Sequence, residues 1–369
     1  MKYYIIAGEP SGDIYGAKLM SSLIKKDTSA QFNYWGGDNM LAVADGLVTH
    51  IRETSIMGFV EVVKNLSKLS VLFKKAKSTI LDFNPDVIIF IDYPGFNLRM
   101  AKWAHNKNIK VVYYISPQVW AWKKSRLEAI KKYVDEMIVI LPFEADFYQK
   151  NGLDVHYVGH PLLEIVNKIQ KEEKLISIDS NKPILALLPG SRKQEIKKIL
   201  PTFVNVAKFF SKDYHIALAC APNISKSFYQ QYFDEELNID LSFESTYMLL
   251  KNADLAVVTS GTATLETALF GVPQVVCYNT SFINYQIGKH LVDLKYISLV
   301  NLIMNKEVVP ELIQSDMNYQ QIKNSLNDVI LNRKTILKDY EILKQKLSTT
   351  MSPSKLAAGI VLSVVDSTY

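Results

Sequence analysis

Short apolar runs along the chain alternate with longer stretches in which apolar residues recur every three or four positions. In the first half these runs are residues 3–7, 87–91, 111–115 and 137–140. Their length and near-absence of polar residues predict strands that are buried on both faces, as in a parallel sheet. The stretches at residues 11–25, 59–81 and 97–106 predict helices that cover the sheet.

The same alternation restarts after a polar stretch at residues 168–182. Apolar runs at residues 184–188, 215–220, 255–259 and 274–278 predict a second set of strands, and residues 317–365 have a helical pattern. We therefore expect an α/β protein of two Rossmann-like, doubly wound parallel-sheet domains that face a cleft. The predicted ranges are 1–172, 173–345 and a C-terminal helix at 346–369. That helix either crosses back to the first domain or is exchanged with a partner chain.

The composition argues against several classes of function but does not identify one. A length of 369 residues suits two domains, and the net charge of 42 − 37 = +5 is too small and too dispersed to indicate nucleic-acid binding. Cys220 and Cys277 lack metal-ligand spacing and are expected to be buried free thiols. No apolar run approaches about 18 residues, and residues 1–7 are too short for a signal peptide. The sequence thus predicts a cytoplasmic protein without a metal.

Ligands in open parallel sheets bind beyond the carboxyl ends of the strands, so we expect the site residues in the loops that follow the strands. Glu9, Ser11, Gly12 and Asp13 follow the first strand and could hold an anion or a sugar hydroxyl at a helix N-terminus, or form an ordinary capped turn. Asp92 ends the apolar run 87–91. Its carboxylate could act as a general base, although the pattern alone slightly favours a helix cap.

One further loop and one predicted helix of the first half carry candidate residues. Residues 116–122 contain Trp120 and Trp122, whose rings could stack on sugars or pack against acyl chains, or fill a core. The helix predicted at 59–81 has an apolar stripe flanked by lysines. Most of that stripe is expected to face the core, and an exposed part would dock on an anionic membrane surface.

Two loops of the second half predict anion binding. Gly190, Ser191 and Arg192 follow a strand and open a helix, so that backbone N–H groups and a guanidinium can meet a phosphate. Residues 260–266 also leave a strand and enter a helix, with small hydroxylated residues beside Gly261. Glu266 in the first turns of that helix could accept hydrogen bonds from both ribose hydroxyls, or simply interact favourably with the helix dipole.

Taken together, these loops resemble the lipid-A-disaccharide synthase family. The strings in register are AGEPSGD at 7–13, SIMGFVEV at 55–62, IDYPGFN at 91–97, SPQVWAW at 116–122, LPFE at 141–144, VGHPL at 158–162, LLPGSR at 187–192, SGTATLE at 260–266 and YISLVNL at 296–302. They extend over about residues 1–315, and their shared order makes the resemblance specific.

The resemblance implies a GT-B glycosyltransferase that needs no metal or other cofactor. The implied reaction joins UDP-2,3-diacylglucosamine to 2,3-diacylglucosamine 1-phosphate (lipid X) with inversion, giving lipid A disaccharide 1-phosphate and UDP. The family is peripheral to the inner membrane, so the implied partners are these two substrates, that lipid surface and, as an option, a second copy of the chain.

The same resemblance implies roles for individual residues. Asp92 matches the proposed base for the acceptor's 6-hydroxyl, and Arg192 matches an essential arginine that we expect to bind the pyrophosphate. The expected nucleotide-sugar site is Gly190, Ser191, Arg192, Ser260, Gly261, Thr262, Ala263, Thr264, Glu266, Tyr278 and Asn301. The expected acceptor site is Glu9, Ser11, Gly12, Asp13, Asn97, Ser116, Trp120 and Trp122. The expected membrane-facing residues are Phe59, Val63, Leu66, Lys68, Leu69 and Phe73.

The chain departs from the family pattern at three positions, Gly95, Lys123 and Val300, where an aspartate, an arginine and a proline are common. These departures concern details of the acceptor site. The alternatives are another GT-B enzyme of UDP-N-acetylglucosamine, namely a 2-epimerase or the peptidoglycan glycosyltransferase, and a two-domain binding protein without catalysis. A requirement for acyl chains on the substrates separates the first alternative from the family reaction.

Overall fold

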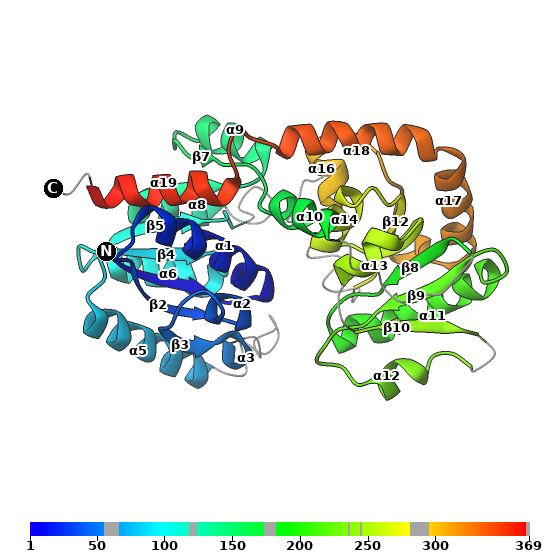
Figure 1. Cartoon of the computed structure of the whole chain (residues 1–369), viewed down its shortest axis with the longest axis horizontal. Helices are drawn as coiled ribbons and strands as arrows, with labels where there is room; N and C mark the ends of the chain where they lie inside the picture. The colour runs from blue at the N-terminus through cyan, green and yellow to red at the C-terminus, as the bar shows by residue number, and fades with distance from the viewer. Residues whose placement is uncertain are drawn as a thin grey trace. The chain divides into compact units, whose positions relative to one another are not determined.

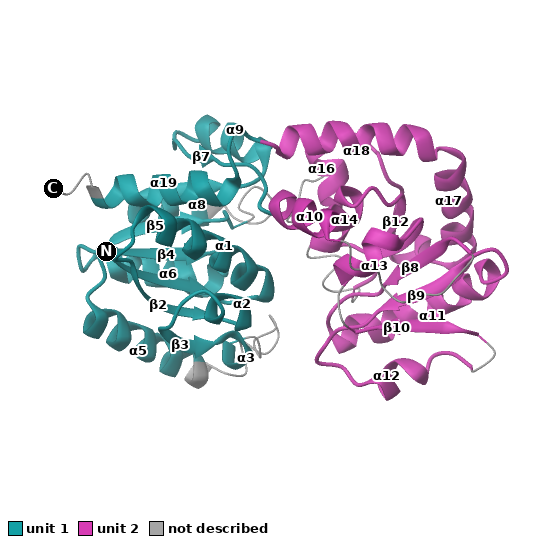
Figure 2. Cartoon of the chain, viewed as in Figure 1, with its two compact units in different colours: residues 1–161, 349–369 teal, residues 162–348 magenta. Residues whose placement is uncertain are grey.

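The computed structural model describes residues 1–54, 66–117, 124–172, 182–234, 237–243, 246–280 and 295–366. The chain divides into two compact units (Figure 2). Unit 1 contains Met1–Pro161 and Thr349–Tyr369, and unit 2 contains Leu162–Ser348. Each unit is built on a parallel sheet with helices on both faces, which confirms the predicted fold class.

The described strands of unit 1 form a seven-stranded parallel sheet in the order β3-β2-β1-β4-β5-β6-β7. Their bounds are β1 Lys2–Ala7, β2 Gln31–Gly36, β3 Leu47–His50, β4 Val87–Ile91, β5 Lys110–Tyr114, β6 Glu136–Val139 and β7 His156–Tyr157. The strand order reverses between β1 and β4. Such a switch point leaves a crevice beyond the carboxyl ends of the two strands, where the loops at Gly8 and Asp92 begin.

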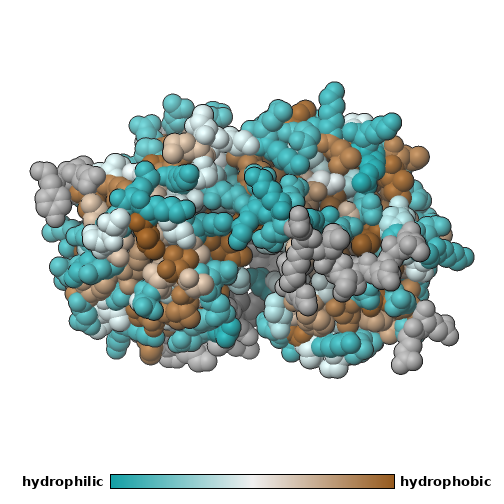
Figure 3. Space-filling model, in the orientation of Figure 1, coloured by the Kyte–Doolittle hydropathy of each residue, from teal (hydrophilic) through white to brown (hydrophobic). Residues whose placement is uncertain are grey.

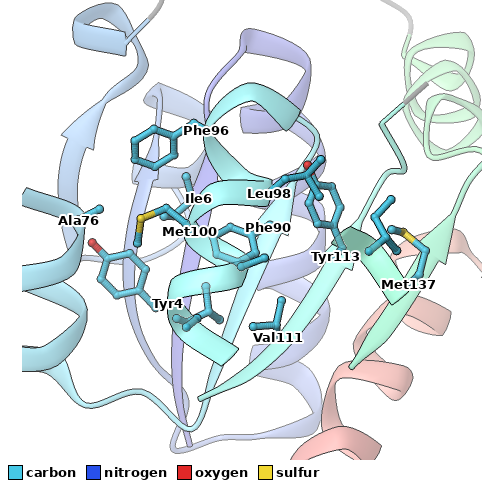
Figure 4. Close-up of a cluster of buried hydrophobic side chains, with 14 of the residues drawn as sticks. Tyr4, Ile6, Ala76, Phe90, Phe96, Leu98, Met100, Val111, Tyr113 and Met137 are labelled. Carbon is cyan, nitrogen blue, oxygen red and sulfur yellow. The ribbon is translucent and has the colours of Figure 1, made fainter. Parts of the chain in front are cut away.

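The helices of unit 1 are α1 Pro10–Lys26, α2 Asp38–Leu41, α3 Ile51–Thr54, α5 Leu66–Phe83, α6 Pro94–His105, α8 Lys124–Tyr133, α9 Pro142–Lys150 and α19 Pro353–Asp366 (Figure 1). Side chains of α5, α6 and α8 pack on one face of the sheet, around Tyr4, Phe90 and Tyr113 (Figure 4). Helix α1 covers the other face, where Gly12 lies against Ala7 and Ile91. The apolar strands are therefore buried on both sides, as their composition requires.

The C-terminal helix α19 belongs to unit 1 of its own chain. It packs along α1, and the Ser22 hydroxyl donates to the Ser354 hydroxyl at 3.0 Å. Just before it, the Thr349 hydroxyl donates to the Val158 carbonyl at 3.0 Å. The sequence had left open whether this helix crosses back or is exchanged, and in this structure it crosses back.

Unit 2 has a six-stranded described sheet in the order β10-β9-β8-β11-β12-β13. The strands are β8 Ile184–Leu188, β9 His215–Ala219, β10 Ile239–Ser242, β11 Leu255–Thr259, β12 Gln274–Tyr278 and β13 Glu311–Ile313. The helices are α10 Leu162–Lys171, α11 Lys193–Phe210, α12 Lys226–Gln230, α13 Thr246–Asn252, α14 Thr262–Leu269, α16 Leu299–Met304, α17 Tyr319–Leu331 and α18 Arg333–Leu347, with a 3₁₀ turn η1 at Gln314–Asp316. The order of the strands reverses between β8 and β11, which places the second switch point there.

The predicted domain ranges differ from the compact units at both crossings. The chain passes from unit 1 to unit 2 at Pro161–Leu162 rather than at residue 172, because α10 packs on α13 and α14 of unit 2. It returns at Ser348–Thr349 rather than at residue 345. The apolar runs located the central strands. The sequence did not predict β2, β3, β7, β10 and β13, whose compositions are more polar or whose lengths are shorter.

Of the residues predicted to face the membrane, the structure describes the side chains of Leu69 and Phe73. It contradicts the prediction for Leu69, whereas Phe73 is partly buried. Leu69 is buried in the core cluster, and the Phe73 ring stacks on Phe96 with centroids 4.4 Å apart. Phe59 and Val63, and the side chains of Leu66 and Lys68, lie outside the described residues. Within the described part of the chain no helix is long and apolar enough to cross a membrane. Hydrophilic residues cover much of the visible face of both units, with hydrophobic patches between them (Figure 3).

Candidate functional site

A cavity of about 470 Å³ lies at the switch point of unit 2. Two strand–helix loops supply much of its wall, one after β8 and the other after β11. From the first come Gly190, Ser191, Arg192 and Glu195, and from the second Ser260, Gly261, Thr262, Ala263 and Glu266. Because α11 and α14 begin at these loops, the N-termini of two helices border the cavity, which favours an anionic ligand.

The loop after β8 requires a glycine at its bend. Gly190 has φ +104°, and a Cβ atom there would lie 2.1 Å from Glu195 Oε2. The Glu195 carboxylate accepts a hydrogen bond from the Ser191 N–H at 3.3 Å. Burial raises the pKa of Glu195, and the backbone N–H groups of Ser191 and Arg192 and the Arg192 guanidinium oppose that rise. The loop is thus fixed by its own helix, and the exposed Arg192 side chain borders the cavity.

Hydrogen bonds to backbone carbonyls hold the loop after β11. The Thr264 hydroxyl donates to the Gly261 carbonyl at 2.8 Å, and the Ser260 hydroxyl donates to the Ile297 carbonyl at 3.3 Å. Thr264 is fully buried and does not border the cavity, so its predicted role in binding is replaced by a role in loop structure.

Glu266 brings a carboxylate to the cavity wall. The Tyr247 hydroxyl donates to Glu266 Oε1 at 3.0 Å. Burial raises the pKa of Glu266 to about 7, and the hydrogen bond from Tyr247 opposes that rise. A partly desolvated carboxylate of this kind is a strong acceptor for ligand hydroxyls.

Two other predicted nucleotide residues do not border this cavity. Asn301 is fully buried: its Nδ2 donates to Val309 O and to Glu311 Oε1, and its Oδ1 accepts from the N–H groups of Val308 and Val309. Because both ends of the amide are used, Asn301 joins α16 to β13 rather than contacting a ligand. Tyr278 ends β12, also away from the cavity.

The structure adds cavity residues that the sequence did not single out. They are Leu188, Glu195, Ala219, Cys220, Ala221, Pro222, Thr246 and Thr259. Three of them, Cys220 to Pro222, follow β9, so the strand-end rule would have found them. Burial raises the pKa of the Cys220 thiol to about 12, which keeps it protonated. Cys220 and Cys277 are both free and buried, as expected.

At the switch point of unit 1, Asp92 has an unusual backbone. Asp92 and Tyr93 have φ values of 46° and 49°, in the left-handed region, which costs on the order of 1–3 kcal/mol per residue. Three hydrogen bonds hold this conformation. The Asp92 carbonyl accepts from the Tyr113 hydroxyl at 2.6 Å and from Asn97 Nδ2 at 2.8 Å, and its N–H donates to the Tyr114 carbonyl at 3.1 Å.

The surroundings of Asp92 favour its protonated form. Burial raises the pKa of Asp92 to about 7, and the nearby charge of Glu9 adds to the rise. The Tyr93 backbone N–H and the Arg126 guanidinium act in the opposite direction. A carboxylate with a pKa near neutrality, held at the carboxyl end of a strand, is suited to accept and release a proton.

Gly8 and Tyr93 connect the two loops of this switch point. The Tyr93 ring covers Gly8 so closely that a Cβ atom there would lie 2.3 Å from Tyr93 Cγ. The loop that carries Glu9 is therefore packed directly against the loop that carries Asp92.

Several predicted acceptor residues have structural roles instead. Asp13 is 2% exposed and accepts four hydrogen bonds, from the N–H groups of Gly37, Asn39 and Met40 and from Asn39 Nδ2. Asn97 is buried and holds the Asp92 carbonyl, and the Ser116 hydroxyl lies 2.7 Å from the Tyr148 hydroxyl. Gly12 allows α1 to approach the sheet.

Of the remaining acceptor residues, Glu9 is exposed and Ser11 is partly exposed beside the switch point. Trp120 and Trp122 lie outside the described residues. Among the residues that the structure describes, no cluster of histidine, cysteine, aspartate and glutamate side chains could hold a metal ion.

Comparison with known proteins agrees with this arrangement. The sequence model of a family described as lipid-A-disaccharide synthetase matches residues 3–361. Relatives named lipid-A-disaccharide synthase include those of Syntrophus aciditrophicus (36% identity, 98% of this chain and 97% of the relative), Trichlorobacter lovleyi (35%, 98% and 97%) and Coxiella burnetii (36%, 89% and 88%).

Solved structures share the fold at low identity. A UDP-GlcNAc 2-epimerase from Neisseria meningitidis bound to UDP-GlcNAc has a TM-score of 0.67 at 13% identity, with all of both chains covered. A calicheamicin glycosyltransferase has a TM-score of 0.63 at 13% identity, covering 100% of this chain and 98% of the other. At such identities these similarities show the fold alone. The family model and the relatives named above favour neither of the two alternative GT-B activities.

Proposed function

The chain belongs to the lipid-A-disaccharide synthase family, and from this premise we propose how its two switch-point sites divide the reaction. It is a UDP-sugar-dependent glycosyltransferase of lipid A disaccharide synthesis. We assign the donor UDP-2,3-diacylglucosamine to unit 2 and the acceptor 2,3-diacylglucosamine 1-phosphate to unit 1. The observation that carries this assignment is the unit 2 cavity, whose wall combines two helix N-termini, a guanidinium and a carboxylate.

The cavity residues fit the separate parts of a nucleoside diphosphate. The N–H groups at the two loops and Arg192 would neutralise the pyrophosphate, which gains negative charge as UDP departs. Glu266 would accept hydrogen bonds from the ribose hydroxyls. No step needs a metal in this scheme, since the positive charge comes from the protein.

Asp92 would act as the base of a single displacement. The acceptor's 6-oxygen attacks the anomeric carbon of the donor, its proton passes to Asp92, and the bond from that carbon to the phosphate oxygen breaks to release UDP. One displacement inverts the α-linked donor to a β-linked product. With a pKa near 7, Asp92 is partly ionised at neutral pH and can take the proton, a contribution of about 10²–10⁴ in rate.

Lipid substrates require access to a membrane, and we propose peripheral association of unit 1 with the cytoplasmic face of the inner membrane. The described part of α5 supports this: Val71 is 63% exposed, and Lys74 is exposed on the same helix. Flotation with vesicles that contain anionic lipid tests it, and a protein that stays with the soluble fraction would contradict it. The homodimer stays a hypothesis that light scattering can test.

The reaction itself is tested by mass spectrometry with detergent-dispersed substrates. We expect a disaccharide phosphate only when UDP-diacylglucosamine and diacylglucosamine 1-phosphate are supplied together. Unacylated UDP-N-acetylglucosamine is the control. Turnover of that control, or UDP binding without any lipid product, would contradict the proposed substrates.

A further inference from the structure

The Glu266 carboxylate is positioned by a tyrosine that no part of the proposed mechanism uses. Tyr247 lies on α13, next to Thr246 of the cavity wall, and its hydroxyl donates to Glu266 Oε1 at 3.0 Å. Among the residues that the structure describes, Tyr247 is the side chain that donates a hydrogen bond to Glu266. It engages one oxygen of a carboxylate that has two.

Tyr247 is held in place by a ring contact and by the burial of its helix. Its ring packs on Phe270 at the end of α14, with centroids 5.9 Å apart and planes inclined by 30°. Leu249 and Leu250, on the same helix, are fully buried in the core of unit 2 together with Val258 of β11. The tyrosine is therefore anchored to the elements that carry the cavity, and its hydroxyl can act as a fixed donor.

We propose that Tyr247 is a positioning residue that makes the nucleotide cavity selective for ribonucleotides over 2′-deoxyribonucleotides. The inference rests on the proposed function, in which Glu266 receives the ribose hydroxyls. The tyrosine hydroxyl occupies Oε1 and thereby orients the carboxylate plane, so that the remaining acceptor positions are directed to the 2′- and 3′-hydroxyls. A carboxylate without this partner samples several rotamers and loses most of that preference.

The hydrogen bond also controls the ionisation of Glu266. Burial raises the pKa of the Tyr247 hydroxyl, so it stays protonated and donates, and its donation favours ionised Glu266. Removing the hydroxyl would raise the pKa of Glu266 further above 4.5, its ordinary value. When the pH is lowered, the variant should therefore lose its preference for ribose at a higher pH than the unmodified chain does. A role confined to packing α13 against α14 would not move this pH dependence.

The test measures calorimetric affinities for UDP and for 2′-deoxy-UDP with the full chain and Tyr247→Phe, which keeps the ring contact with Phe270. We expect the unmodified chain to prefer UDP by about tenfold or more, as for a hydrogen bond to a charged group. In Tyr247→Phe the preference should fall below about threefold, through weaker UDP binding. The midpoint of UDP affinity against pH should rise.

Tyr340→Phe is the matched control. Its hydroxyl is buried in unit 2, donates to the Val272 carbonyl at 3.3 Å and accepts from Gln274 Nε2 at 3.4 Å, and Tyr340 does not line the cavity. This variant should lose thermal stability while keeping the preference for UDP and its pH midpoint.

The outcomes separate this inference from the proposed function. If Tyr247→Phe keeps the full preference and the same pH midpoint, the positioning role is overturned while nucleotide binding stands. If the unmodified chain binds both nucleotides equally, Glu266 does not read the ribose, and both the inference and that part of the proposed function are overturned. Loss of the preference in Tyr340→Phe as well would assign the effect to stability and overturn the inference.

Discussion

Replacing Asp92 by asparagine separates the proposed proton acceptor from the backbone that carries it. Asparagine tolerates the left-handed region as well as aspartate does, so the φ of 46° and the bonds to the Asp92 carbonyl should survive. The amide cannot accept the proton of the acceptor hydroxyl. We expect kcat to fall by about 10²–10⁴-fold, with the affinity for UDP unchanged because the nucleotide cavity lies in unit 2.

The same substitution should change how stability depends on pH. The pKa of Asp92 rises from 3.8 in the unfolded chain to about 7 in the fold, so between these values the folded state binds the extra proton. This group's contribution to stability is complete below pH 3.8 and is lost as pH rises through 7. The slope is about 1.4 kcal/mol per pH unit, and the whole span is on the order of 4 kcal/mol. Asparagine has no such slope.

Two measurements therefore test one residue. Steady-state kinetics from pH 5 to 8 should show kcat rising with pH through about 7 in the unmodified chain and a low, flat profile in Asp92→Asn. Urea denaturation should show Asp92→Asn gaining stability relative to the unmodified chain between pH 5 and pH 8. Near-normal turnover in the variant, or a stability difference that is the same at both pH values, would refute the reasoning.

Three further predictions concern single positions. Arg192→Ala should weaken UDP binding about 10- to 100-fold by calorimetry, as for a lost charge-assisted hydrogen bond; unchanged affinity would contradict its phosphate role. Gly8→Ala places a methyl group 2.3 Å from Tyr93 Cγ, so the Asp92 loop must shift and turnover should drop while UDP affinity is kept. Asn301→Ala leaves buried groups unpaired at about 1–3 kcal/mol each, so thermal stability should fall. If the folded Asn301→Ala variant instead bound UDP more weakly, Asn301 would belong to the nucleotide site and its purely structural role would be contradicted.

Polar residues near strand ends were the hardest to interpret from sequence. Asp13, Asn97 and Asn301 share a sequence environment with the proposed ligand-binding residues, since all stand beside apolar runs and helix starts. Their partners come from elsewhere in the chain: Asp13 accepts hydrogen bonds from residues 37–40, and Asn301 is satisfied at residues 308–311. A sequence motif gives no sign of whether a buried polar group is satisfied by a ligand or by the chain itself.

The sequence by itself determined the two parallel sheets and the loops at their switch points. Short, almost wholly apolar runs such as Ile184–Leu188 and Leu255–Thr259 are typical of strands buried on both faces, and the small residues that follow them allow the turns at Gly190 and Gly261. The family strings added the reaction and singled out Asp92 and Arg192.

Only the tertiary structure decided what surrounds those residues. The near-neutral pKa of Asp92 depends on burial and on Glu9, which approaches from another loop, and the orientation of Glu266 depends on Tyr247 from another helix. It also decided that Leu69 and Phe73 face the core and that α19 returns to unit 1. Electrostatic environment, hydrogen-bond partners and burial arise from contacts between distant segments, and a local pattern of residue types cannot encode them.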